Sequence, residues 1–251
     1  ICMVDDLTSR AFVLHQMPYR ETSALVDFVT ANYGCIRAVC RGVRSSGKTG
    51  ARLRSALQPL AELELQLSGK SELKTVKSVE VFRPAPLLNQ QQLYAAIYIN
   101  ELTQKLSIKH SAGELIYDVY RSAVLELSKK NKDAVSSIKD SLETTLRCFE
   151  FDLLAALGFE IDFSFDSLSG DPIDPKGYYQ FNAESGFVAI AKQCERQNSS
   201  AVITVEGSCL LRLANSDFAD AKVLAAAKRI SRAAINHCIE GKPLNTRSLY
   251  R

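Results

Sequence analysis

The chain has 251 residues, which is enough for one large domain or two small ones. With 46% hydrophobic and 24% charged residues, its composition is that of a globular protein that buries a core without disulfide support. The net charge of +3 is too small to indicate a polyanionic partner by itself. Because no signal-peptide pattern occurs and no apolar stretch approaches the roughly 20 residues that span a bilayer, we expect a soluble, cytoplasmic protein without a membrane partner.

The seven cysteines lie singly along the chain, without a C-x-x-C pair. An odd number of scattered thiols favours reduced side chains in a cytosol. We expect most of them to be small, buried, apolar residues.

The first 83 residues alternate between apolar and polar positions. Residues 10–15, 23–30, 35–41, 61–67 and 72–82 are predicted strands. In the fourth strand, Leu63, Leu65 and Leu67 share one face, while Glu62 and Glu64 lie on the other. Five short strands with one long connection at residues 42–59 favour a small closed barrel, most commonly an OB-fold, with an antiparallel sandwich as the alternative.

The period changes to that of helices after Arg83 and Pro84, where we place the boundary between domains 1–83 and 84–251. Helices are predicted over residues 92–108, 113–128, 141–157 and 217–238, the last with Ser216 or Asp217 as its N-cap. Residues 161–191 are rich in turns, with strand-like pieces at 178–182 and 187–191. The predicted fold is α+β: an N-terminal five-stranded OB-fold barrel, then an α-helical domain with a small irregular β insertion. The predicted apolar stripe of the first helix comprises Leu93, Tyr94, Ile97, Tyr98, Leu102 and Leu106.

The strongest local signal is electrostatic. No acid occurs between Asp27 and Glu62. We expect the two basic residues of the third strand to share a face that continues into a glycine-containing basic loop. Binding of a phosphate chain to such a surface releases condensed counterions. The slope of log K against log salt therefore becomes more negative by about 0.9 for each neutralised phosphate. The predicted DNA-binding residues are Arg37, Arg41, Arg44, Lys48, Arg52 and Arg54; a solvated surface that serves only solubility is the alternative.

Residues 42–49 also satisfy the pattern G-x-x-x-x-G-K-[ST] of a phosphate-binding loop. That loop works where it opens a helix inside a parallel sheet. Only residues 51–58 follow before Pro59 and the next strand, and no magnesium-binding Asp follows a downstream apolar run. We therefore interpret the match as accidental, with a nucleotide-hydrolysing enzyme as the alternative. His15, His110 and His237 lie in three different segments, and we expect no catalytic residue.

The last predicted helix and the residues after it are also basic. Lys228 and Arg232 stand one turn apart, on the face away from Leu224 and Ile230. They form either a second DNA contact or an ordinary solvated face. The other basic residues of this region are Lys222, Arg229, Lys242, Arg247 and Arg251, against the single acid Glu240.

Short motifs recur in a fixed order along the chain. They are residues 10–15 (RAFVLH), 21–23 (ETS), 41–44 (RGVR), 57–59 (LQP), 93–94 (LY), 98–102 (YINEL), 146–150 (LRCFE), 157–159 (LGF), 241–244 (GKPL) and 247–249 (RSL). No single motif is decisive, but their order and spacing together are specific. On these motifs the chain resembles the bacterial RecO family over nearly its whole length.

This resemblance implies an OB-fold joined to a helical domain, and a recombination mediator rather than an enzyme. It implies binding of single- and double-stranded DNA and annealing of complementary strands. The implied partners are RecR, the C-terminal tail of single-strand-binding protein and, indirectly, RecA, at a nucleoid-associated location. It also assigns residues 42–49 to DNA. Many members carry four cysteines as a zinc site after the motif LGF, but residues 161–177 contain none, so we expect no metal and no cofactor.

The tail of single-strand-binding protein is acidic and ends in an aromatic residue with a free carboxylate, so its receptor should be an apolar pocket with a basic rim. Arg147, beside Phe149, is the first candidate, followed by Arg121, Lys129 and Lys130. Pairing of Arg147 with Glu143 or Glu150 on the helix surface is the alternative. A further hypothesis is an adaptor that docks an acidic peptide through Arg147 and binds no DNA.

Overall fold

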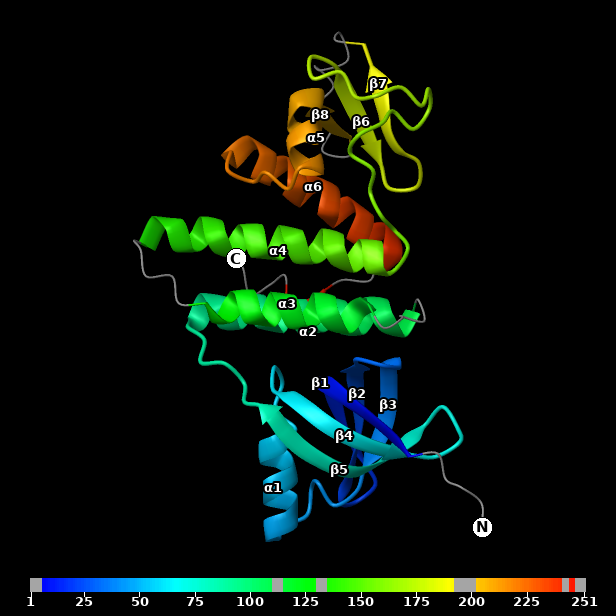
Figure 1. Ribbon diagram of the computed structural model, residues 1–251, viewed down its shortest axis with the longest axis vertical. Helices are drawn as coiled ribbons and strands as arrows, with labels where there is room; N and C mark the ends of the chain where they lie inside the picture. Colours follow the sequence, from blue (N-terminus) through cyan, green and yellow to red (C-terminus); the bar gives the residue numbers. More distant parts are fainter. Residues whose placement is uncertain (1–5, 110–114, 130–134, 192–201, 241–243, 247–251) are drawn as a thin grey trace. The chain divides into compact units, whose positions relative to one another are not determined.

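The computed structural model describes residues 6–109, 115–129, 135–191, 202–240 and 244–246 (Figure 1). The chain divides into two compact units. The first comprises residues 1–130 and 244–251, and the second comprises residues 131–243. The first two helices after the barrel therefore belong to the same compact unit as the barrel, whereas the predicted domain boundary at Arg83 remains a prediction.

The first unit contains a closed five-stranded barrel, drawn in blue and cyan in Figure 1. Its strands are β1 (Leu7–Tyr19), β2 (Ser23–Thr30), β3 (Gly34–Cys40), β4 (Glu62–Ser68) and β5 (Lys74–Arg83). They follow one another around the barrel in the order β1-β2-β3-β5-β4, and only β3 and β5 pair in parallel. A helix, α1 (Lys48–Ala56), connects β3 to β4. This arrangement is that of an OB-fold and confirms the predicted fold class.

The alternation of apolar residues places the barrel core as predicted. Leu63, Leu65 and Leu67 of β4 are completely buried, and they pack in one cluster with Val26 and Phe28 of β2. Burial of each such side chain contributes about 1.5–3 kcal/mol. The period-two pattern of the sequence therefore specifies the side chains that form the core of the barrel.

Helix α2 (Gln90–Lys109) packs against β1, and helix α3 (Leu115–Ser128) packs against α2 and against β2 and β3. The ring of Phe12 packs against Tyr117 and Tyr120 of α3, with centroids 5.5 and 5.0 Å apart. The predicted stripe of α2 is partly wrong, because Leu93 and Ile97 are exposed. The buried face instead includes small side chains that let the helix backbone approach the strand: Ala95, Ala96 and Thr103, beside Tyr98, Ile99, Leu102 and Leu106.

The second unit combines helices with a three-stranded sheet of order β7-β6-β8. Strands β6 (Tyr178–Asn182) and β7 (Gly186–Ile190) confirm the two predicted strand-like pieces. Sequence reasoning missed β8 (Ile203–Glu206) and α5 (Gly207–Ala214), which are too short for a clear period. Helix α4 (Val135–Ala156) packs against α6 (Ala221–Cys238).

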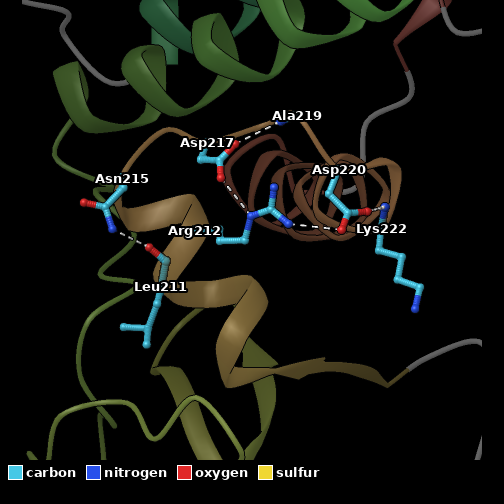
Figure 2. A network of polar contacts seen from close by, with 7 residues as sticks. All are labelled: Leu211, Arg212, Asn215, Asp217, Ala219, Asp220 and Lys222. Atoms are coloured by element: carbon cyan, nitrogen blue, oxygen red, sulfur yellow. Dashed lines mark hydrogen bonds and ion pairs between the residues drawn. The ribbon is translucent and has the colours of Figure 1, made fainter.

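The predicted start of α6 is wrong, because its N-cap is Asp220. The Asp220 carboxylate accepts a hydrogen bond from the amide of Lys222, 2.8 Å away (Figure 2). Arg212, near the end of α5, donates to Asp217 at 2.8 Å and to Asp220 at 3.0 Å. Asp217 is thus held in the connection between the two helices, so α6 begins later than expected.

A carboxylate forms several hydrogen bonds within the turn-rich insertion. Asp166 is buried, and it accepts hydrogen bonds from the amides of Leu168, Ser169 and Ala189 at 2.7–3.1 Å. These amide donors, that of Ala189 foremost, hold the pKa of Asp166 below its ordinary value. The Asp166 side chain therefore connects residues 168–169 to Ala189 of β7.

Candidate nucleic-acid interface

The basic loop that follows β3 is attached to the hairpin between β1 and β2. The amide of Arg44 donates to the carbonyl of Thr22 at 2.8 Å, and its Nη1 donates to the carbonyl of Arg20 at 3.1 Å. The guanidinium of Arg20 lies 5.2 Å from the ring centroid of Tyr19. Sequence reasoning missed this hairpin, although adjacent Tyr and Arg residues between two predicted strands offered a signal for a nucleic-acid contact.

Arg54 holds the same loop against α1. Its Nη1 donates to the carbonyls of Val43 at 2.7 Å and Ser45 at 2.8 Å. The loop lies so close to the helix that a Cβ on Gly50 would sit 2.3 Å from the carbonyl oxygen of Ser45. The predicted DNA-binding residue Arg54 therefore acts first as a support for the loop.

The phosphate-loop pattern at residues 42–49 does precede a helix, which the sequence analysis did not predict. Helix α1 begins at Lys48, with Gly47 as its N-cap. Even so, the loop carbonyls of Val43 and Ser45 face a guanidinium, whereas a phosphate-binding loop directs its amides towards the ligand. The surrounding sheet is also a mostly antiparallel barrel rather than a parallel sheet, so the geometry does not favour nucleotide binding.

Four cations of the loop and helix are exposed together: Arg41, Arg44, Lys48 and Arg52. None of the four lies within 4.0 Å of a carboxylate in the described part of the chain. Glu21 is exposed in the adjoining hairpin and forms no ion pair with them there. The region thus presents unneutralised positive charge on an OB-type barrel.

Arg37 does not belong to this group. Its guanidinium forms two hydrogen bonds with Asp27, Nε to Oδ1 at 2.6 Å and Nη2 to Oδ2 at 3.0 Å. Hydrogen bonding to Asp27 raises the pKa of Arg37. Because β3 ends at Cys40, Arg41 lies in the following turn and not on the strand face with Arg37. Arg37 instead lines a separate groove of about 780 Å³ with Tyr33, Leu73 and Lys74.

The two residues of the second predicted DNA contact lie in different environments. Arg232 on α6 is exposed, whereas Lys228 forms an ion pair with Glu143 of α4. Arg229 donates to the carbonyl of Val202 at 3.4 Å. Lys242, Arg247 and Arg251 lie outside the described residues.

The residues predicted to bind the tail lie in different environments. Arg147 pairs with Glu150 at 2.9 Å as the alternative interpretation held, but the pair is buried rather than on the helix surface, and Nη1 also donates to Ser231 at 3.2 Å. Phe149 is buried as well. A tail-binding role for Arg147 and Phe149 remains a prediction, and neither side chain is exposed in the structure. Of the others, Lys129 is exposed and paired with Glu126, Arg121 lies beside Glu62, and Lys130 is outside the described residues.

Neither a membrane-spanning segment nor a metal site is apparent in the described residues. No described helix is both long and apolar enough to cross a bilayer. No group of three or more His, Cys, Asp or Glu side chains with the geometry of a metal site occurs among the described residues either.

The barrel with its inserted helix defines the class of this protein: an OB-type barrel joined to helices. Two family models match the chain: "Recombination protein O N terminal" over residues 3–85 and "Recombination protein O C terminal" over residues 89–248. Proteins called DNA repair protein RecO are similar along their length. The protein of Glaesserella parasuis is 36% identical over 96% of this chain and 94% of its own, and that of Escherichia coli K12 is 37% identical over 96% and 93%.

The chain belongs to the RecO family of DNA repair proteins. This family consists of recombination mediators and not of catalytic enzymes. The resemblance that the sequence motifs indicated is thereby confirmed.

Proposed function

We propose that this protein binds single- and double-stranded DNA through the surface formed by Arg41, Arg44, Lys48 and Arg52, and that it anneals complementary strands there. The observation that carries the proposal is the exposure of these four cations, without carboxylate partners among the described residues, on an OB-type barrel. A surface binds a phosphate chain most strongly when its positive charges are not already neutralised by carboxylates. Tyr19 and Arg20 of the adjoining hairpin add a ring and a further cation.

The wider role follows from family membership. We propose that the protein acts with RecR to load RecA onto DNA that is coated by single-strand-binding protein, and that the acidic tail of the latter recruits it. Arg232 is the candidate for a second DNA contact. An adaptor without DNA binding is the competing hypothesis, and a DNA titration separates the two.

The salt dependence of binding tests the DNA surface. We expect the double variant Arg41→Gln/Arg52→Gln to lower the slope of log K against log salt by about 0.7 for each arginine on a single-stranded oligonucleotide. Fluorescence anisotropy of a labelled oligonucleotide measures the slope, and strand annealing should slow in parallel. Neither side chain forms a described hydrogen bond, so the fold should be unaffected.

The matched control is Lys70→Gln/Lys176→Gln, which removes two exposed positive charges elsewhere. We expect the control to keep the slope of the wild-type protein. Equal slopes for the loop variant, the control and the wild type would mean that the strand does not lie on this surface. No DNA binding by the wild type would leave the adaptor hypothesis.

A further inference from the structure

Three arginines surround one buried carboxylate at the end of the barrel. Glu62 of β4 is almost completely buried, and three guanidinium groups approach it: Arg10 of β1 at 3.9 Å, Arg83 of β5 at 3.7 Å and Arg121 of α3 at 3.5 Å. The hydroxyl of Tyr117 donates to its Oε1 at 2.7 Å. We call Arg10, Arg83 and Arg121, with Phe82, the arginine cluster.

The three guanidinium groups form ion pairs with two acids, Glu62 and Glu64. The three contacts with Glu62 are ion pairs of 3.5–3.9 Å, and Oε2 of Glu62 accepts no hydrogen bond among the described residues. Glu64 is the second acid, 3.7 Å from Arg10. In the part of the chain that the structure describes, none of the three guanidinium groups donates a hydrogen bond, and their side chains are 34–43% exposed. Their donors are therefore available to an external anion.

An exposed aromatic ring completes the cluster. Phe82 of β5 is 50% exposed, and the guanidinium of Arg10 lies over its ring, 3.0 Å from the centroid. Rings and guanidinium planes of this kind form stacking platforms for nucleobases in single-strand-binding barrels.

The surroundings favour a nucleic acid over an acidic peptide. The cavity beside Arg83 and Arg121 has a volume of only about 40 Å³, which is too small for an aromatic side chain at the end of a peptide. A phosphodiester needs only surface donors. In addition, α1, which carries Lys48 and Arg52, packs against β5, the strand that ends in Phe82 and Arg83. The cluster and the proposed DNA surface therefore involve elements that pack against each other.

We infer that the arginine cluster is a second subsite for single-stranded DNA, in which the guanidinium groups bind phosphates and Phe82 stacks on a base. This inference rests on the proposed function. With two subsites on one barrel, a strand is held over a longer stretch than the basic loop alone spans.

The absence of tryptophan from the chain allows a direct test. The substitution Phe82→Trp introduces a single fluorescent ring at the proposed stacking position, and we expect single-stranded DNA to quench it. The matched control is Phe165→Trp, which places the reporter at a phenylalanine of similar exposure, 48%, in the other compact unit. Its emission should not change. An unchanged signal at position 82, when anisotropy shows that the DNA is bound, would overturn the inference.

Binding energetics provide the second readout. We expect Phe82→Ala to weaken binding of a long oligonucleotide about tenfold. The double variant Arg10→Gln/Arg83→Gln should lower the salt slope by about 0.7 per arginine. Lys77→Gln on the same strand is the control, because Lys77 is paired with Asp6 at 2.6 Å, and it should leave the slope unchanged. Thermal melting verifies that each variant is folded.

The outcomes distinguish the two proposals. If the loop variant Arg41→Gln/Arg52→Gln loses affinity while the reporter at position 82 and the cluster variants behave as wild type, the second subsite is wrong and the proposed function stands. If the wild type binds no DNA, both fail. If an acidic peptide ending in phenylalanine changes the reporter signal and DNA does not, the cluster is a peptide site and the inference is overturned.

Discussion

At the scale of single residues, the same side-chain type has different roles within a short stretch of sequence. Arg37, Arg41 and Arg54 all belong to the run without acids between Asp27 and Glu62. Arg37 is neutralised by Asp27, Arg41 is exposed, and Arg54 holds the loop through two backbone carbonyls. A count of charges therefore does not predict how many cations a phosphate chain meets.

Arg54 should support the loop rather than only add charge. Its two hydrogen bonds contribute about 1 kcal/mol each, so Arg54→Met should make opening of the loop about 30 times more favourable. We expect trypsin to cut after Arg44 correspondingly faster, as followed by mass spectrometry. Arg52→Gln is the control, because Arg52 makes no described hydrogen bond. Equal cleavage in both variants would show that the two carbonyl contacts do not hold the loop.

At the scale of elements, α3 is attached to the barrel by aromatic packing and by a buried carboxylate. Tyr117 contacts the ring of Phe12 and donates to Glu62. Burial and the hydrogen bond to Glu62 raise the pKa of Tyr117, so its hydroxyl stays protonated and remains a donor at neutral pH. This contact places Arg121 of the same helix beside Glu62.

Tyr117→Phe should therefore weaken this attachment while keeping the ring. Loss of the donor leaves an oxygen of a buried carboxylate without its hydrogen bond, which should lower the free energy of unfolding by about 1–3 kcal/mol. Chemical denaturation measures the change. Tyr33→Phe, at an exposed tyrosine of the barrel, is the control and should have almost no effect. A similar stability for both variants would contradict the role of this hydrogen bond.

The elements also show where sequence reasoning succeeds. The leucines of β4 alternate so regularly that the sequence predicts the strand, its buried face and its place in the core. Helix α1 was missed because its nine residues follow a glycine-rich loop and present few apolar positions. Burial of Arg147 depends on Ser231, 84 residues away, and the arginine cluster combines three distant segments. Such contacts between distant segments leave no local pattern in a single sequence.

At the scale of the whole molecule, the chain returns to its first compact unit at residues 244–246. Glu101 of α2 accepts hydrogen bonds from the amides of Asn245 and Thr246, each at 2.9 Å, and from the hydroxyl of Thr246 at 2.7 Å. Burial opposes the charge of Glu101, but these donors outweigh it and lower its pKa to about 2. The carboxylate thus connects the C-terminal segment to α2.

The pH dependence of stability tests this connection. The pKa of Glu101 is lower in the folded protein than its ordinary value of 4.5. The charged carboxylate therefore stabilises the folded protein fully above about pH 4.5, and this stabilisation is lost as the pH falls towards 2. Glu101→Gln should therefore lower Tm clearly at about pH 7 and much less at about pH 3. Glu126→Gln, at an exposed acid of α3, is the control. A Tm difference that does not change with pH would contradict the assignment.

The return of residues 244–246 to α2 makes the second compact unit an insertion within the first. On the ribosome, the barrel and its two helices emerge long before Thr246 does. The contact with Glu101 can form only after the entire second unit has been synthesised. Completion of the first unit therefore has to wait for residues 244–246, and a protein that lacks this segment would keep its barrel sequence but lose the connection to Glu101.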